Sequence, residues 1–306
     1  NNASTVSGRN VMLNLNYNDA NGISECRQSN YNLSKLTFRC TFNNNYVCEN
    51  KENPKESISN YFVTGLNNKA VNISSDITFE KLIYNNFNKF NLNEGTIELW
   101  YYPLLSSPTS DYFFAGNRSG GESEFLFYRE ANNIIFKWKN QTGETQLNST
   151  ANMISNKWHH LAATYEKVSE GSHIAKIFLN GALLNSTTTG TNYPSQNITD
   201  IEIGSTNMQG KANKSIDEFL LFNYAKNDSE ILEDFYKPAG YEFQVCSATK
   251  SWLLTEGYGN KTVWFQAKDN AGNIQTAANQ IEMNVVGDSS APTSLTIRMV
   301  STYTND

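Results

Sequence analysis

The chain has 306 residues, which is enough for two domains, and 39% of them are hydrophobic, so sizeable cores can form. Its net charge of −6 argues against a nucleic-acid partner, because there is no basic surplus to neutralise phosphates. No apolar run approaches the roughly 20 residues of a membrane-spanning helix, so we expect no membrane span.

The cysteines indicate an oxidising compartment. There are four, without the repeated spacing of zinc ligands, in a chain that also contains 44 Asn, 29 Ser and 25 Thr. An even count in such a sequence favours two disulfides and a location outside the cytosol. The alternative at this point is four buried free thiols.

Strand patterns dominate the chain in sequence order. Apolar residues alternate with polar ones in many short runs, most of which are bounded by Asn, Gly or Ser. These runs are 11–17, 96–100, 124–128, 134–138, 160–165, 175–179 and 201–203. Asn180-Gly181 predicts a type I′ hairpin between two of them. Only 229–235 is typical of a helix, with Ser229 as its candidate cap.

Glycosylation signals are frequent. The motif Asn-x-Ser/Thr occurs eleven times, and chance alone predicts about eight in a chain of this composition. If the source organism glycosylates, we expect sugar at Asn148, Asn185 and Asn260, which lie beside turn signals. We also expect it at Asn72, although a strand beginning at Ile73 would reduce access there.

Catalytic constellations are weak, and we expect no enzyme. His159 and His160 are adjacent in a predicted strand, so their side chains point to opposite faces and cannot chelate together. His173 shows no ligand-type spacing to either. Asp217 and Glu218 split across faces in the same way, and no E-x-D-x-x-E run of a retaining glycosidase is present. Phosphate-binding loops and nucleophile elbows are also absent.

Aromatic residues offer a candidate sugar platform. Tyr101, Tyr102, Tyr112, Phe113 and Phe114 cluster around one predicted loop. Stacking on a sugar ring needs exposed aromatic faces. Most aromatic residues of a sandwich lie in its core, which is the competing interpretation.

The middle of the chain resembles a laminin-G-like, concanavalin-A-like jelly roll. Four segments carry the resemblance in order: Gly95–Pro103 (G-T-I-E-L-W-Y-Y-P), Trp158–Tyr165 (W-H-H-L-A-A-T-Y), Ile177–Gly181 (I-F-L-N-G) and Ile216–Ala225 (I-D-E-F-L-L-F-N-Y-A). The resemblance implies an antiparallel sandwich. It also implies a calcium site at Asp217, which matches an acidic position before the last strand. A buried acid that accepts backbone hydrogen bonds is the alternative.

The two ends of the chain resemble the halves of a bacterial or archaeal surface Ig-like domain. Arg9–Asn30 is similar to the first half and Tyr241–Asn273 to the second. The resemblance implies that Cys26 and Cys246 lie on neighbouring strands and form a disulfide. Cys40 and Cys48, separated by seven residues, are expected to pair locally.

The segment Ala291–Val300 resembles the first strand of the next Ig-like domain in a tandem array. Leu295, Ile297 and Met299 alternate with polar residues, as in an amphipathic edge strand. The resemblance implies that the small sandwich lacks its own first strand and receives one from a neighbouring copy. Two alternatives are that the strand folds back into its own chain, which we expect the short linker 287–292 to disfavour, and that the chain is one unit of a covalent array.

We therefore expect an all-β protein with an antiparallel jelly-roll sandwich inserted in a smaller Ig-like sandwich. Residues 1–32 and 239–286 would form the discontinuous Ig-like domain, 33–238 the jelly roll, and 287–306 a linker with the donor-type strand. The function expected first is a structural subunit of an extracellular filament or cell-surface array, joined head to tail into a homopolymer. The alternative is a carbohydrate-binding adhesin module with glycan partners.

Overall fold

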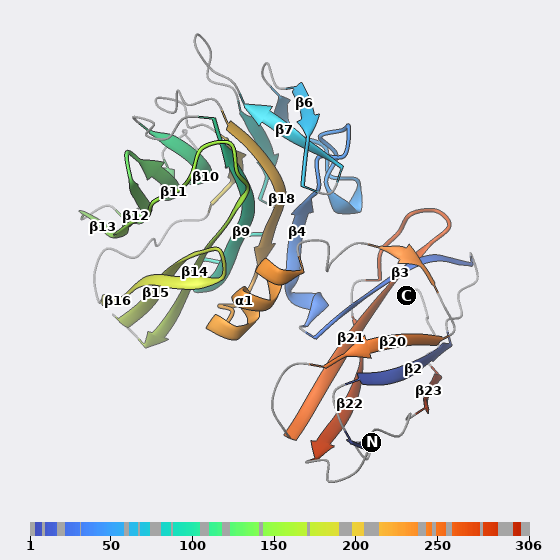
Figure 1. Cartoon of the computed structure of the whole chain (residues 1–306). Helices are drawn as coiled ribbons and strands as arrows, with labels where there is room; N and C mark the ends of the chain where they lie inside the picture. Colours follow the sequence, from blue (N-terminus) through green and yellow to red (C-terminus); the bar gives the residue numbers. More distant parts are fainter. Residues whose placement is uncertain are drawn as a thin grey trace. The chain divides into compact units, whose positions relative to one another are not determined.

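The chain folds into two units in a computed structural model, each described here by itself (Figure 1). One unit joins Asn1–Ser34 to Ala239–Asp306, and the other comprises Lys35–Pro238. The structure describes residues 4–7, 10–16, 22–30, 32–57, 61–66, 68–73, 81–86, 88–104, 110–117, 123–140, 143–169, 172–189, 198–204, 214–237, 243–246, 249–254, 259–275, 278–286 and 296–300. Within them no helix is long and apolar enough to cross a membrane.

The larger unit is a sandwich of two antiparallel sheets. The first sheet has seven strands in the order β13-β12-β11-β10-β17-β8-β5. Their bounds are β5 (Glu56–Ser57), β8 (Leu82–Asn85), β10 (Asp111–Asn117), β11 (Ser123–Glu130), β12 (Asn133–Asn140), β13 (Gly143–Thr150) and β17 (Asp200–Ile203).

The second sheet has eight strands in the described part of the chain. Their order is β16-β15-β14-β9-β18-β7-β6, with β4 also paired to β18. Their bounds are β4 (Leu36–Cys40), β6 (Tyr61–Thr64), β7 (Lys69–Ile73), β9 (Glu94–Pro103), β14 (His159–Ser169), β15 (Ser172–Leu179), β16 (Ala182–Thr189) and β18 (Lys214–Phe222). Two single-turn 3₁₀ helices, Leu33–Lys35 and Glu49–Lys51, interrupt the early connections.

The main core lies between these two sheets. Inward-facing phenylalanines of three neighbouring strands form one row, because Phe114 pairs with Phe127 and Phe127 with Phe136. Ile97, Leu161 and Ile177 face them from the second sheet, and all six are buried. This burial of large apolar side chains is the main stabilising contribution, at about 2 kcal/mol for each side chain fully removed from water.

Helix α1 (Asp228–Tyr236) packs on the outer face of the second sheet. The side chain of Asn227 accepts a hydrogen bond from the backbone N–H of Glu230, and the side chain of Glu230 accepts one from the backbone N–H of Asn227. The cap is therefore Asn227 and not Ser229, which the sequence suggested. Ile231 packs against Ala162 and Phe178 of the sheet. The helix therefore covers strands β14 and β15 with its apolar face.

Buried charges lie beneath this helix. The ammonium of Lys226 lies 2.6 Å from Glu98 Oε1 and also pairs with Asp234 of α1. His160 Nε2 lies 3.2 Å from the other oxygen of Glu98. Burial raises the pKa of Glu98, but Lys226 and His160 outweigh it and bring that pKa to about 2. The network ties the helix to β9 and β14.

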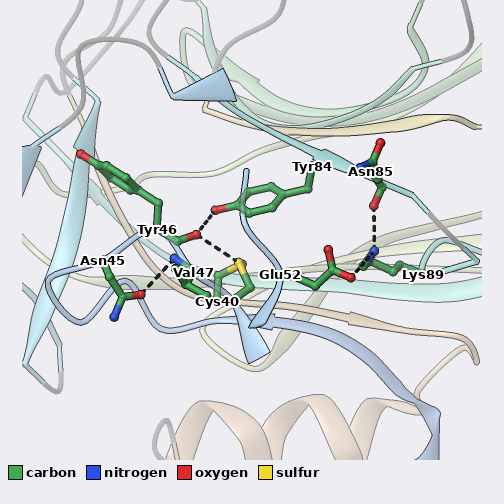
Figure 2. The surroundings of a disulfide bond; sticks show 9 residues. Cys40, Asn45, Tyr46, Val47, Glu52, Tyr84, Asn85 and Lys89 are labelled. Carbon is green, nitrogen blue, oxygen red and sulfur yellow. Dashed lines mark hydrogen bonds and ion pairs between the residues drawn. A yellow bond between two sulfur atoms is a disulfide. The ribbon is translucent and has the colours of Figure 1, made fainter. Parts of the chain in front are cut away.

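A disulfide joins Cys40 to Cys48 near the start of this unit, as the sequence predicts (Figure 2). Around it, the hydroxyl of Tyr84 donates to the carbonyl of Tyr46 over 2.7 Å, and Lys89 pairs with Glu52 at 3.1 Å. Cys40 pairs with Phe219 of β18, and Cys48 donates its backbone N–H to the carbonyl of Glu52, so the loop between the cysteines is held at both ends.

The smaller unit is a second sandwich built from both ends of the chain. One sheet has the order β1-β22-β21-β3-β19 and the other β20-β2-β23. Their bounds are β1 (Ser4–Ser7), β2 (Asn10–Asn16), β3 (Ile23–Ser29), β19 (Gln244–Val245), β20 (Thr249–Leu253), β21 (Gly259–Asp269), β22 (Asn279–Val286) and β23 (Thr296–Val300). Leu13, Val263 and Met283 lie in its core, and a disulfide joins Cys26 to Cys246.

Two expectations about this sandwich are wrong: that it lacks a strand of its own before β2, and that its linker is too short for the last strand to fold back. β1 lies parallel to β22, so the chain itself supplies a strand N-terminal to β2. β23 lies parallel to β2 of the same chain, although the linker seemed too short for this. The physical reason is that two packed sheets are only about 10 Å apart, whereas nine residues can span about 30 Å.

The Asn180-Gly181 turn provides a test of how α1 is seated. Both residues have positive φ, 51° and 79°, as a type I′ turn requires. A Cβ on Gly181 would lie 2.8 Å from Leu232 Cδ1 and 3.1 Å from the backbone of the helix. We expect Gly181→Ala to lower the free energy of unfolding by about 2 kcal/mol, measured by urea denaturation.

Gly116→Ala is the matched control for this substitution. A Cβ there meets neighbours only at ordinary contact distances of 3.4–3.5 Å, so we expect a change within about 0.5 kcal/mol. Equal losses in the two variants would show that the helix does not constrain the turn.

Candidate functional site

The aromatic cluster predicted from the sequence does not form one exposed platform. Tyr101, Phe113 and Phe114 are buried in the main core. Tyr102 instead packs against Trp158, with ring centroids 5.3 Å apart. Tyr112 alone of these five residues reaches the outer face of the seven-stranded sheet, where a different set of side chains surrounds it.

Asp217 has a structural environment. Its Oδ2 accepts a hydrogen bond from the backbone N–H of Leu66 at 2.8 Å, and its Oδ1 accepts one from that of Glu218 at 2.9 Å. Glu218 has a positive φ of 45° at an irregularity in β18, and Arg39 binds its carboxylate at 3.0 Å. Among the described residues no three His, Cys, Asp or Glu side chains are grouped as metal ligands. These contacts give calcium at Asp217 no support.

The two adjacent histidines have separate surroundings. His159 Nε2 lies 3.0 Å from the carbonyl of Ile154, and burial lowers the pKa of this imidazole. His160 belongs to the buried Glu98 network described above. Strand geometry thus separates them, and His173 is buried elsewhere, on β15.

The expected glycosylation sites fall into two groups. Asn148, Asn185 and Asn260 are exposed on β13, β16 and β21. Asn72 is only 3% exposed, and its amide donates to Ser215 Oγ at 3.2 Å. The folded chain therefore does not offer Asn72 to a glycosylating enzyme.

A buried apolar row crosses three strands on the side of the seven-stranded sheet that faces away from the main core. Tyr112 of β10 pairs with Tyr128 of β11, which pairs with Ile135 of β12. The two tyrosine rings stack, with centroids 4.9 Å apart and an interplanar angle of 16°. Burial raises the pKa of Tyr128 to about 12, so both hydroxyls remain donors at neutral pH.

A polar row lies beside it on the same face. Glu202 of β17 pairs with Ala115, Ala115 with Leu126, and Leu126 with Lys137. Asp200, which precedes Glu202 by two residues on β17, pairs with Asn117 of β10. We call the surface around Tyr112, Tyr128, Glu202 and Asn117 the tyrosine face. Its side chains come from strands that are up to 90 residues apart in sequence.

Two acceptors on the tyrosine face are incompletely satisfied. Glu202 Oε1 accepts from Lys81 at 3.0 Å, and a hydrogen bond from the side chain of Asn117 also acts on this carboxylate. Within the described ranges, Glu202 Oε2 and Asn117 Oδ1 have no partner at good hydrogen-bond geometry. Both residues are 2% exposed. Burial raises the pKa of the Glu202 carboxyl, and the attraction of Lys81 opposes this shift without cancelling it.

This geometry suits recognition of a hydroxyl-rich ligand. Aromatic side chains contact the apolar faces of sugars, and unsatisfied acceptors can receive their hydroxyl protons. Each nearby acid has its own cation, since Asp200 pairs with Lys55 and Glu202 with Lys81. Sequence reasoning missed Tyr128 and Glu202. The alternation in Asp200-Ile201-Glu202 was the available signal, because it places two acids on one face of a strand.

Comparison with known proteins agrees with the jelly-roll architecture. Residues 78–232 match the model of the concanavalin A-like lectin/glucanases superfamily. No curated protein sequence matches the chain.

Many solved structures are similar in fold, and three of them are described here. The binding domain of Paraclostridial Mosquitocidal Protein 1 is 17% identical, with a TM-score of 0.54 over 66% of this chain and 52% of its own. The type G botulinum neurotoxin receptor binding domain is 10% identical, with a TM-score of 0.53 and coverages of 83% and 80%. Domain 4 of AbnA, a GH43 extracellular arabinanase from Geobacillus stearothermophilus solved with arabinotriose, is 16% identical, with a TM-score of 0.50 and coverages of 65% and 97%.

This chain therefore spans about half the length of the mosquitocidal binding domain. Since the family model covers more than half of the 306 residues, the chain belongs to the concanavalin A-like lectin/glucanases superfamily.

The titration of Glu202 provides a test of the electrostatics of this face. Because its pKa is raised in the folded chain, the folded state binds more protons than the unfolded state between the two pKa values. The stability that protonated Glu202 contributes at low pH is therefore lost as the pH rises from the pKa of the unfolded chain through the higher pKa of the folded chain. We expect the stability of the native chain, relative to Glu202→Gln, to fall as pH rises from 4 to 7 in urea titrations.

Lys81→Met removes the cation that opposes the shift, so the decline should become steeper in this variant. A native chain that gains stability over Glu202→Gln with rising pH would contradict the raised pKa.

Proposed function

We propose that this chain is an extracellular, non-catalytic binding module whose jelly roll takes carbohydrate on the tyrosine face. The observation that carries the proposal is one face on which a stacked, largely buried tyrosine pair lies near two buried polar groups, Glu202 and Asn117, that retain acceptor capacity. Two disulfides support a location in an oxidising compartment outside the cytosol.

Carbohydrate suits these groups better than an apolar ligand does. A buried acceptor without a donor costs roughly 1–3 kcal/mol, and a sugar hydroxyl would remove that cost on binding. An apolar ligand would leave Glu202 Oε2 and Asn117 Oδ1 unsatisfied. Tyr112 and Tyr128 are 7% and 8% exposed, so the stacked pair offers a sugar a small contact area in a rigid arrangement.

The similar structures support the same choice. The arabinanase domain was solved with arabinotriose, and the toxin domains are described as binding or receptor-binding domains. These proteins share the fold at low sequence identity, so the sugar that this chain binds is to be identified by the experiment below.

A glycan array followed by calorimetry tests the proposal. We expect binding to at least one oligosaccharide, with arabinotriose and a sialylated oligosaccharide among the probes. Tyr128→Ala should weaken that binding by about fivefold, because one aromatic contact contributes about 1 kcal/mol. Tyr128→Phe should retain most of it, since the ring remains.

Tyr61→Ala is the matched control. Tyr61 is a 48% exposed tyrosine of β6 in the other sheet, so its removal should leave affinity unchanged. A native chain that binds no glycan on the array, or Tyr128→Ala binding as well as native, would refute the tyrosine face as the site.

We propose as a second function that the small sandwich joins copies head to tail. The favouring observation is that β23 pairs with β2 alone among the described strands. Of the three apolar residues expected in the donor-type segment, Ile297 and Met299 lie on β23, and Leu295 lies outside the described residues. The same strand offered to β2 of the next copy makes the same ladder, and repetition of such a contact builds an open filament.

Deleting residues 291–306 tests strand exchange. Light scattering and electron microscopy should show assembly of the full chain and loss of assembly after the deletion, because β2 then keeps β20 on one side and lacks a partner on the other. The truncated chain should bind a synthetic peptide of residues 295–300.

A peptide with Ile297→Pro should not bind, since proline cannot donate to the ladder. Filaments that persist without residues 291–306, or a stable truncated monomer indifferent to the peptide, would exclude strand exchange.

A further inference from the structure

The two sheets of the jelly roll end in long edge strands on one side of the sandwich. β13 terminates the seven-stranded sheet and β16 the eight-stranded sheet, and each has eight residues. They lie beside each other, because the side-chain amide of Asn185 donates to the backbone carbonyl of Asn148 over 2.7 Å. Their outer backbone groups can template association with another chain.

These edges have little of the usual protection against such pairing. β16, with the sequence ALLNSTTT, contains no charged residue and no proline, and Leu183 is 42% exposed on it. β13 has one charged residue, Glu144, whose carboxylate is engaged by Lys137 at 2.6 Å. The strands at the opposite ends, β5 and β6, have only two and four residues. The two long edge strands, β13 and β16, are thus also the ones with few free charges to prevent strand pairing.

Both strands carry a glycosylation motif at their point of contact. Asn148-Ser149-Thr150 lies on β13 and Asn185-Ser186-Thr187 on β16, and both asparagines are exposed. Asn72 and Asn117 carry the same motif on β7 and β10 but are 3% and 2% exposed. The chain therefore contains its own comparison between accessible and inaccessible acceptors.

We propose that Asn148 and Asn185 are N-glycosylated as a pair, and that the two glycans cover the open edges of the sandwich against strand pairing. Asn Nδ2 forms a bond to the anomeric carbon of a sugar, and the bond from that carbon to the phosphate of a lipid-linked oligosaccharide donor breaks. The lipid phosphate leaves with the bonding electrons, and one amide proton passes to a base of the transferase.

The contact between the two strands survives this modification. A glycosylated amide retains one N–H, so Asn185 can still donate to the carbonyl of Asn148. Each glycan adds bulk and hydroxyl groups where a further strand would align. The protection is steric and hydrophilic, and it replaces the charges that β16 lacks. The proposal does not depend on which ligand the tyrosine face binds.

Glycopeptide mapping tests the modification. The chain is secreted from a host that N-glycosylates, and the folded, monomeric protein is digested and analysed by mass spectrometry. We expect sugar at Asn148 and Asn185 and none at Asn72 or Asn117. Asn148 or Asn185 found bare in this material, or sugar on Asn72 and Asn117, would overturn the assignment.

A pair of double variants tests the protective role. Thr150→Ala/Thr187→Ala removes both motifs and leaves the two asparagines in place, whereas Thr150→Ser/Thr187→Ser preserves both motifs. We expect the alanine variant to associate at about tenfold lower concentration than the serine variant in light scattering. Equal association of two folded variants would refute edge protection.

A measurement on native protein excludes a folding defect as the cause. An endoglycosidase that leaves a single sugar trims the folded native chain without any substitution. We expect the trimmed protein to associate at a lower concentration than untrimmed protein. Unchanged association after complete trimming would refute the protective role even if the alanine variant aggregates.

Discussion

Burial of the phenylalanine row between the two sheets is the constraint on which the rest of the jelly roll depends. Phe114, Phe127 and Phe136 must face inward together, since a shift of one residue would expose all three to water. Their inward position forces the intervening residues outward, and so the tyrosine pair stands on the opposite face. The candidate binding surface is thus a consequence of core packing, because the two faces of a strand cannot be chosen independently.

Local patterns predicted much of the architecture, and the misplaced aromatic residues show where such patterns fail. The Asn180-Gly181 hairpin and the helix followed from short-range chemistry. Around Phe113 a register irregularity lies between Tyr112 and Phe114, so Phe113 and Phe114 both enter the core, where strict alternation would separate them. Glu202 was missed for a different reason. It joins the tyrosine face only because β17 inserts beside β10, and strand order is not encoded in the local pattern.

Ionisable groups are used in two ways in this fold. Beneath α1, Glu98, Lys226 and Asp234 saturate one another, so the buried charges fasten the helix and leave little capacity for a ligand. On the tyrosine face the cation reaches only one oxygen of Glu202. A saturated network favours a structural role, whereas a buried acceptor left without a donor is a site at which a ligand gains affinity. This contrast, more than the number of charges, distinguishes the two faces of the sandwich.

Both units contain sheet edges whose backbone groups need a partner or a cover. In the small unit the chain covers β2 with its own β23, so backbone satisfies backbone. In the jelly roll the long edges β13 and β16 have no such strand within the described residues. Head-to-tail joining through β2 can be specific only if β2 is a better acceptor of strands than the other long edges. A hydrophilic cover at Asn148 and Asn185 would create that difference by weakening the competing pairing, without strengthening the β2 contact.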